Sequence, residues 1–375
     1  MRKDNILLLH VGTPKTGTST LQTFLYENEK SLLENDWVYP NLYGVILGKP
    51  DLHVRNGLVL NDSVGTRKSG VVWAQIKQQL RRYNVIISGE DLWEDTRGIS
   101  LEDRLKVFIR HYKNIYVLVY LRRQDYYVES MWNYDIKTNK TPFDICEYLK
   151  TDECATEQTE YLKKLISVEK IIGKNRIIVR PFEKEQLQKG DIRYDFLHVM
   201  ESLSHPIDTN RFLFKQSENK GLSDGMLSLA MEFYKVYYKY ADKPSVEIIE
   251  CFDKLNDSGI MGYEKRKYLD KDTREEFLKR YQESNEEIAR RYLNRNDGNL
   301  FYDQRVDFPI WEKRNFQGNE RIIEIIAYSA AMTKRRTEID YRYPIGVMES
   351  IQQVVFLLKY ILKRSIIWLK LIVRS

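Results

Sequence analysis

Short runs of apolar residues mark the first half of the chain, at 6–9, 85–87, 115–121 and 177–179. Uninterrupted apolar runs of this length are typical of parallel strands covered on both faces. In the intervals between them, apolar residues recur at helical spacing over 71–83, 101–112, 125–138 and 156–172. Because strand and helix alternate, the pattern predicts an α/β fold built on a doubly wound parallel sheet.

Helical spacing dominates the second half of the chain. It predicts helices at 192–202, 223–241, 245–256, 272–293 and 318–337. A Pro- and Gly-containing break at Tyr341–Gly346 precedes a last segment of different composition. We therefore expect three parts, an α/β domain at 1–310, a helical extension and linker at 311–346, and an amphipathic helix at 347–375.

The last segment has a cationic stripe on an otherwise apolar helix. At 100° per residue, four of its five cations fall within a sector of roughly 60°, and they are Lys359, Lys363, Lys370 and Arg374. Charges at these intervals argue against spanning a membrane. They favour a helix that lies in the interface over anionic lipid. Packing against the body of the protein or a dimer partner is the alternative.

Charge and cysteine content narrow the class of protein. The net charge is +6, but the last 25 residues contribute +5, so the remainder sums to about +1 and a general nucleic-acid binder is not expected. Three scattered cysteines, Cys146, Cys154 and Cys251, favour a reducing compartment over a disulfide framework or a zinc site. The first apolar run is too short for a signal peptide. We expect a cytoplasmic protein, peripheral at the inner face of the plasma membrane.

The loop after the first predicted strand has the pattern of a phosphate cradle. Gly12 and Gly17 are spaced as in a nucleotide-triphosphate P-loop, but Thr18 occupies the position where that motif requires lysine. The lysine comes earlier, at Lys15. A strand that leads through such a loop into a helix presents backbone N–H groups to an anion, so the sheet is predicted to be of P-loop type. A magnesium-dependent kinase is disfavoured and remains the rival enzyme.

The loop resembles the 5′-phosphosulfate-binding loop of sulfotransferases that use 3′-phosphoadenosine 5′-phosphosulfate (PAPS). A second stretch, Val119–Ser130, is similar to the segment in which this family binds the 3′-phosphate with an Arg and a Ser eight residues later. Softer likenesses at 88–93, 180–183 and 219–223 resemble bacterial members that modify cell-surface polysaccharides. The resemblance implies donor-binding roles for Pro14, Lys15, Thr16, Gly17, Thr18, Ser19, Thr20, Arg122 and Ser130. Arg123 is the alternative to Arg122.

The same resemblance implies transfer of a sulfuryl group from PAPS to a saccharide hydroxyl, with release of adenosine 3′,5′-bisphosphate. Lys15 is the candidate cation for the leaving phosphate, and no metal is required. The acceptor's proton needs a base, for which Glu90 and His53 are the two main candidates and Asp91 is a weaker substitute. Related glycan sulfotransferases use a glutamate, and some relatives use a histidine.

Three further expectations concern side chains and function. His10, inside an apolar strand, is expected to be a core histidine rather than a ligand. Trp93 and Trp132 either stack on sugar rings or belong to the core. A non-catalytic, nucleotide-sensing membrane scaffold is the alternative to an enzyme.

Overall fold

The computed structural model of the chain describes most residues before 317 and a few beyond. The described residues are 5–42, 56–57, 69–94, 99–138, 140–141, 144–151, 158–215, 221–240, 246–316, 323, 326–328 and 330. The His53 position and the predicted helix at 347–375 lie outside them, as does most of the helix predicted at 318–337.

The chain divides into two compact units. The first unit contains Met1–Met131, Cys146–Lys220 and Leu269–Phe308. The second unit contains Trp132–Ile145, Gly221–Tyr268 and Pro309–Ser375. The division of the chain at 310 and 346 stays a prediction.

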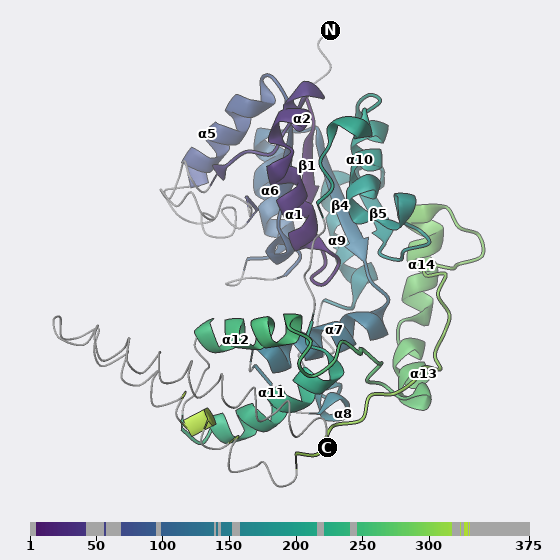
Figure 1. The fold of residues 1–375 in the computed structure, drawn as a ribbon. Helices are drawn as coiled ribbons and strands as arrows, with labels where there is room; N and C mark the ends of the chain where they lie inside the picture. The colour runs from purple at the N-terminus through teal and green to yellow at the C-terminus, as the bar shows by residue number, and fades with distance from the viewer. Residues whose placement is uncertain are drawn as a thin grey trace, which may run out of the picture. The chain divides into compact units, whose positions relative to one another are not determined.

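A five-stranded parallel sheet forms the centre of the first unit (Figure 1). Its strands are β1 (Leu7–His10), β2 (Trp37–Val38), β3 (Asn84–Ser88), β4 (Ile115–Leu121) and β5 (Ile177–Pro181). They lie in the order β2-β3-β1-β4-β5, with Leu9 opposite Ile87 on one side and Val117 on the other. The four predicted strands are confirmed. Only β2 was missed, since two residues show no periodicity.

Helices cover both faces of the sheet, so the predicted doubly wound α/β fold is confirmed. On one face the core contains side chains from α5 (Ser69–Leu80), α6 (Leu101–His111), α9 (Tyr161–Ile172) and α14 (Gln282–Leu293). On the other face it contains side chains from α1 (Thr18–Glu27), α2 (Glu29–Glu34) and α10 (Ile192–Leu203). Leu7 and Leu9 point to the first core and Leu8 to the second, as the alternation of side chains along a strand requires.

Two predicted helices are interrupted. The segment 272–293 forms α13 (Lys271–Lys279) and then α14, because Arg280 and Tyr281 separate them. The helix after the loop is likewise divided at Asn28 into α1 and α2. The Asn28 side chain fastens this break to a distant segment, since it donates to the Leu213 carbonyl (3.0 Å) and accepts from the Leu213 amide (2.7 Å).

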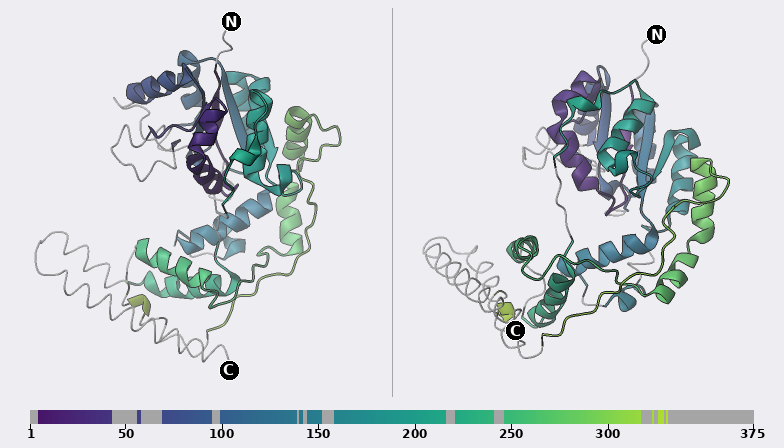
Figure 2. Two further views of the ribbon diagram at one scale, coloured as in Figure 1. Left: turned by 45° about the horizontal axis from the view of Figure 1, so that its top comes forward. Right: turned by 45° about the vertical axis from the view of Figure 1, so that its right-hand side comes forward.

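The second unit is helical. Its α11 (Asp224–Tyr237) and α12 (Val246–Asp257) lie side by side (Figure 2), with Phe233 and Tyr234 of α11 against Phe252 of α12. The last residues of α7 (Gln124–Lys137) and the start of the one-turn helix α8 (Ile145–Tyr148) also belong to it. Along the ranges given above, no helix combines the length and the apolar character that crossing a membrane requires.

Candidate functional site

The loop between β1 and α1 has an unusual backbone. Gly12, Lys15 and Gly17 all have positive φ angles, of 72°, 64° and 78°. Glycine adopts such angles without strain, but at Lys15 the same conformation costs roughly 1–2 kcal/mol. A β-carbon on Gly12 would lie 2.9 Å from the Glu90 α-carbon, so this glycine is also required by close approach of the chain. Three residues of the loop therefore have positive φ angles, which are found neither in extended strands nor in right-handed helices.

Two buried threonines fasten the loop to the neighbouring strand. Thr13 donates from its backbone amide (3.2 Å) and its hydroxyl (3.0 Å) to the carbonyl of Tyr120 in β4. The Thr16 hydroxyl donates to the Thr13 carbonyl at 2.6 Å, which closes the turn on itself. Because β4 is fixed by its pairing on both sides, these bonds fix the loop relative to the sheet.

The loop ends at a helix terminus with free hydrogen-bonding capacity. Gly17 precedes α1 and no side chain caps this end of the helix, so its first-turn amides have no intrahelical carbonyl partners. The Thr18 hydroxyl is buried and has no hydrogen-bond partner within the part of the chain that the structure describes. It lies beside Gly12, 3.4 Å from where a β-carbon on that residue would be. An orphaned hydroxyl beside the first amides of a helix is a donor set that a phosphate oxygen accepts from.

Arg122, directly after β4, reaches this loop. Its Nη1 donates to the backbone carbonyl of Lys15 at 2.8 Å, and its own carbonyl accepts from the Tyr161 hydroxyl at 2.8 Å. Burial lowers the pKa of Arg122, while the charges of Asp125 and Glu129 act in the opposite direction. Among the described residues it forms no salt bridge with a carboxylate. Its guanidinium therefore lies beside the loop without a carboxylate partner in the described parts of the chain.

Arg123 is the opposite case. Its Nε and Nη2 each donate to the Asp125 carboxylate at 2.7 Å, and its guanidinium also donates to the carbonyls of Asp303 and Arg305. The Tyr126 ring lies 4.1 Å beneath it. With its donors occupied by protein groups, Arg123 is structural, which leaves Arg122 as the arginine available to a ligand.

Ser130 lies in α7, two turns after Arg122 and within the first unit. It is partly exposed. Its distance from the loop is not fixed by any hydrogen bond among the described contacts. Its role in binding the donor stays a prediction.

Glu90 begins the turn Glu90–Leu92 that follows β3 and contacts the loop at Gly12. The residue is partly exposed. The other candidate base, His53, lies outside the described residues. The chain is described again at Asn56, whose side chain bonds to both the Ile86 carbonyl (2.9 Å) and the Ser88 amide (2.8 Å). These bonds hold Asn56 against the end of β3, two residues before Glu90. They were not predicted, because no local sequence pattern indicates a contact between such distant residues.

His10 is buried, so the prediction of a core histidine is confirmed as to its position. Its Nδ1 lies 2.8 Å from the Ser88 hydroxyl, and its ring meets those of Tyr120 and Phe196 edge to face. Nε2 is buried without a hydrogen-bond partner among described residues. Burial lowers the pKa of His10 from 6.5 to about 3, so the ring is neutral at physiological pH.

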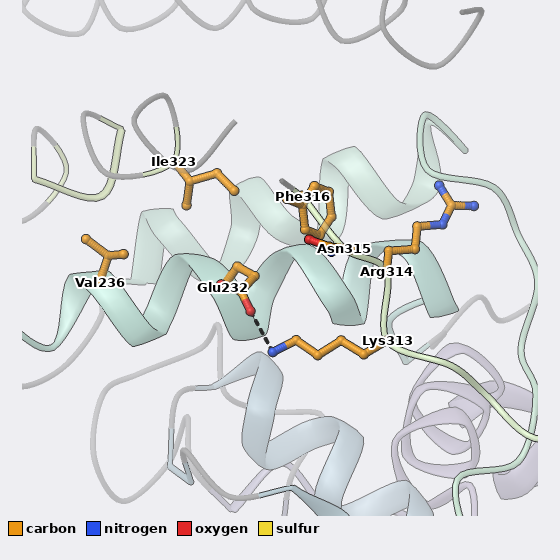
Figure 3. Close-up of a pocket in the computed structure, with 7 residues that line it drawn as sticks. All are labelled: Glu232, Val236, Lys313, Arg314, Asn315, Phe316 and Ile323. Atoms are coloured by element: carbon orange, nitrogen blue, oxygen red, sulfur yellow. Dashed lines mark ion pairs between the residues drawn. The ribbon is translucent and has the colours of Figure 1, made fainter. Parts of the chain in front are cut away.

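The suggestion that Trp93 and Trp132 stack on sugar rings is wrong. Both side chains are fully buried and belong to the packing of the protein. A cavity of about 260 Å³ lies instead along α11 in the second unit, where Lys313 reaches back to Glu232 at 2.6 Å (Figure 3). None of the predicted site residues lines it. Among residues with described positions, no three His, Cys, Asp or Glu side chains gather to hold a metal ion.

The contacts missed at the sequence level are mostly distant pairs. Phe182 and Ile192 pack against Gly17, where an added β-carbon would lie 3.4–3.5 Å from them. Arg274 forms buried ion pairs with Asp125 and Glu129 in α7. The acidic pair at positions i and i+4 is visible in the sequence, but its arginine partner lies far along the chain and has no local signature.

Comparisons with known proteins find one distant sequence relative and a solved structure of low similarity. The sequence matches no protein-family profile. A protein from Archaeoglobus fulgidus, described only as uncharacterized, is 23% identical over 260 aligned residues. That match covers 64% of this chain and 66% of the relative, just under two thirds of its length. The solved structure of a sulfotransferase from Alicyclobacillus acidocaldarius superposes with a TM-score of 0.37 and 12% identity, over 68% of this chain and 96% of that one. At this level of likeness the activity has to be inferred from the site.

Proposed function

We propose that the protein transfers a sulfuryl group from PAPS to a hydroxyl group of a saccharide and releases adenosine 3′,5′-bisphosphate. The main support is the hydrogen bond between Arg122 and the Lys15 carbonyl. It brings a guanidinium, which has no carboxylate partner among the residues that the structure describes, against the loop that presents Thr18 and the first amides of α1. A donor with phosphates at both its 5′ and 3′ positions needs two such cationic or amide-rich groups within one site.

In this proposal the loop binds the 5′-phosphosulfate and Arg122, with Ser130, binds the 3′-phosphate. The acceptor oxygen attacks sulfur as the bond between sulfur and the phosphate oxygen breaks. Negative charge develops on that phosphate oxygen, where Lys15 would stabilise the transition state more than the ground state. Loop residues Pro14, Thr16, Ser19 and Thr20 complete the 5′-phosphate cradle.

The acceptor hydroxyl must lose its proton as the new S–O bond forms. Glu90 is our first candidate for the base, because it contacts the loop at Gly12 and remains partly exposed. His53 is the second, on its residue type and its position three residues before the anchored Asn56. An accessible carboxylate or imidazole can take the proton directly or through a water molecule.

The acceptor class and the location are proposals from the sequence. A saccharide carried on a lipid or a cell surface suits an enzyme whose C-terminal segment, 347–375, binds anionic membrane. The resemblance to bacterial polysaccharide sulfotransferases supports this choice.

Ligand-dependent thermal stability tests the donor class. Adenosine 3′,5′-bisphosphate without metal should raise the melting temperature, since a ligand that binds the folded state stabilises it by mass action. Adenosine 5′-monophosphate is the matched control, because it lacks only the 3′-phosphate. Stabilisation by ATP with magnesium, and not by the bisphosphate, would identify a kinase. Transfer of labelled sulfate from PAPS to a panel of oligosaccharides then tests the reaction and the acceptor.

A further inference from the structure

The N-terminal half of α7 contains two buried carboxylates one turn apart. Asp125 and Glu129 are 0% and 4% exposed. They follow Arg122 closely in sequence, and both act on its pKa through their charge. A buried carboxylate without a partner is strongly unfavourable, and a nearby arginine is the group it would pair with.

Other arginines already occupy both carboxylates. Arg123 binds Asp125 through two bonds of 2.7 Å. Arg274 of α13, fully buried, donates Nη1 to Asp125 and Nη2 to Glu129 at 2.7 Å. The two negative charges are thus balanced by two guanidinium groups within the first unit.

Arg274 also holds the segment before α13 against α7. Its Nη2 donates to the Leu269 carbonyl at 3.1 Å, while the Leu269 amide donates to Glu129 at 3.0 Å. The carboxylate of Glu129 is therefore fixed from two directions and points to Arg274. Both bonds are accepted by Oε1 of Glu129, and the charge of this carboxylate is paired with Arg274.

We propose that Arg274 is a positioning residue for the 3′-phosphate of the donor, an inference that rests on the proposed function. By neutralising and orienting Asp125 and Glu129, it keeps Arg122 available to the ligand. Without Arg274, Glu129 loses its arginine partner, while Arg123 stays bonded to Asp125. Arg122, on which both carboxylates already act through their charge, is then a cation that Glu129 can attract. A guanidinium turned toward these carboxylates would no longer be free to bind phosphate.

The test compares the preference for adenosine 3′,5′-bisphosphate over adenosine 5′-monophosphate, measured by titration calorimetry. In Arg274→Gln this preference should fall about 10-fold, a typical effect of losing a charge-assisted hydrogen bond. Affinity for the monophosphate should stay within about 2-fold, since the 5′ cradle is unchanged. Arg291→Gln, which breaks the bidentate pair of Arg291 with Glu169 on α9, is the control and should keep the wild-type preference.

A second variant separates charge from folding. Glu129→Gln combined with Arg274→Gln removes one charge of each sign, so it leaves no excess carboxylate to attract Arg122. The double variant should regain most of the wild-type preference for the bisphosphate over the monophosphate. If Arg274→Gln alone does not fold, the double variant is the one that tests the inference. Equal loss for both ligands, or a double variant as defective as Arg122→Ala, would overturn the inference. If Arg122→Ala abolishes the preference but Arg274→Gln keeps it, the proposed function stands and this inference falls. If the wild type shows no preference, both fall.

Discussion

The Nη1 atom of Arg122 lies 2.8 Å from the carbonyl oxygen of Lys15. Lys15 lies in the loop after β1, whereas Arg122 directly follows β4, so the two residues are far apart in the sequence. Because β1 and β4 are adjacent parallel strands, their carboxyl ends meet at one edge, and the hydrogen bond fixes the arginine against the loop. This edge of the sheet is therefore where we expect a ligand with two anionic groups.

Lys15→Ala should reduce sulfate transfer by ~10²–10³-fold, because it removes the cation nearest the leaving phosphate oxygen in the proposed mechanism. Binding of adenosine 3′,5′-bisphosphate should weaken less than the rate. The measurement is kcat with saturating PAPS. Lys30→Ala, an exposed lysine in α2, is the control and should behave as wild type. An unchanged rate in Lys15→Ala would remove the lysine from the mechanism.

The two candidate bases can be separated by rate. Loss of a general base costs ~10²-fold or more, so one of Glu90→Gln and His53→Ala should fall by at least this factor. We expect it to be Glu90→Gln, with little change in bisphosphate affinity. Asp91→Asn tests the weaker candidate, the neighbouring carboxyl in the same turn, and should keep a rate near that of the wild type. If both variants stay within a few-fold of wild type, neither residue is the base.

Gly12→Ala should impair both stability and activity. The alanine would adopt a left-handed conformation at a cost of ~1–2 kcal/mol, and its β-carbon would meet the Glu90 backbone. Gly173→Ala is a matched control, since Gly173 also has positive φ but nothing lies within 4 Å of its β-carbon position. It precedes β5, at the other edge of the sheet, and should lose stability while keeping activity. Thermal unfolding and sulfate transfer are measured on both variants.

The folded protein should become less stable as the pH is lowered, because His10 is buried in its neutral form. Burial lowers the pKa of His10 to about 3 in the folded protein, while the unfolded chain takes up the proton near pH 6.5. The contribution is therefore fully present above pH 6.5 and is lost as the pH falls below it, by up to ~1.4 kcal/mol per pH unit. Urea unfolding between pH 7 and 4 should show a steeper loss in wild type than in His10→Gln. His198→Gln, on the exposed side of α10, should keep the wild-type slope.

Removal of residues 347–375 should abolish sedimentation with anionic vesicles and leave bisphosphate binding intact. If the cationic stripe contacts the lipid, removing a charge on the stripe should weaken vesicle binding more than removing a charge outside it. Lys363→Gln, on the stripe, should weaken sedimentation, whereas Arg364→Gln, outside it, should weaken it less. Binding should also fall with added salt, because screening reduces attraction to the surface. Equal sedimentation of full-length and truncated protein would refute membrane binding through this segment.

The sequence by itself determined four of the five strands of the sheet and the loop after the first of them. Continuous apolar runs such as Ile115–Leu121 admit few structures other than a covered strand, and Gly12 and Gly17 follow the first of them at a spacing typical of a phosphate-binding turn. These signals are local, so each can be interpreted without knowing what packs against it. The helix interruption at Arg280–Tyr281 was missed, because apolar spacing continues through it.

Only the tertiary structure decided which of two adjacent arginines is available to a ligand. Arg122 and Arg123 follow the same strand, but Asp125 and two backbone carbonyls occupy Arg123, while Arg122 reaches the loop. It also placed Arg274 against Asp125 and buried Trp93. The physical reason is that burial and charge pairing depend on contacts between segments far apart in the chain, and such contacts leave no periodic pattern in the sequence.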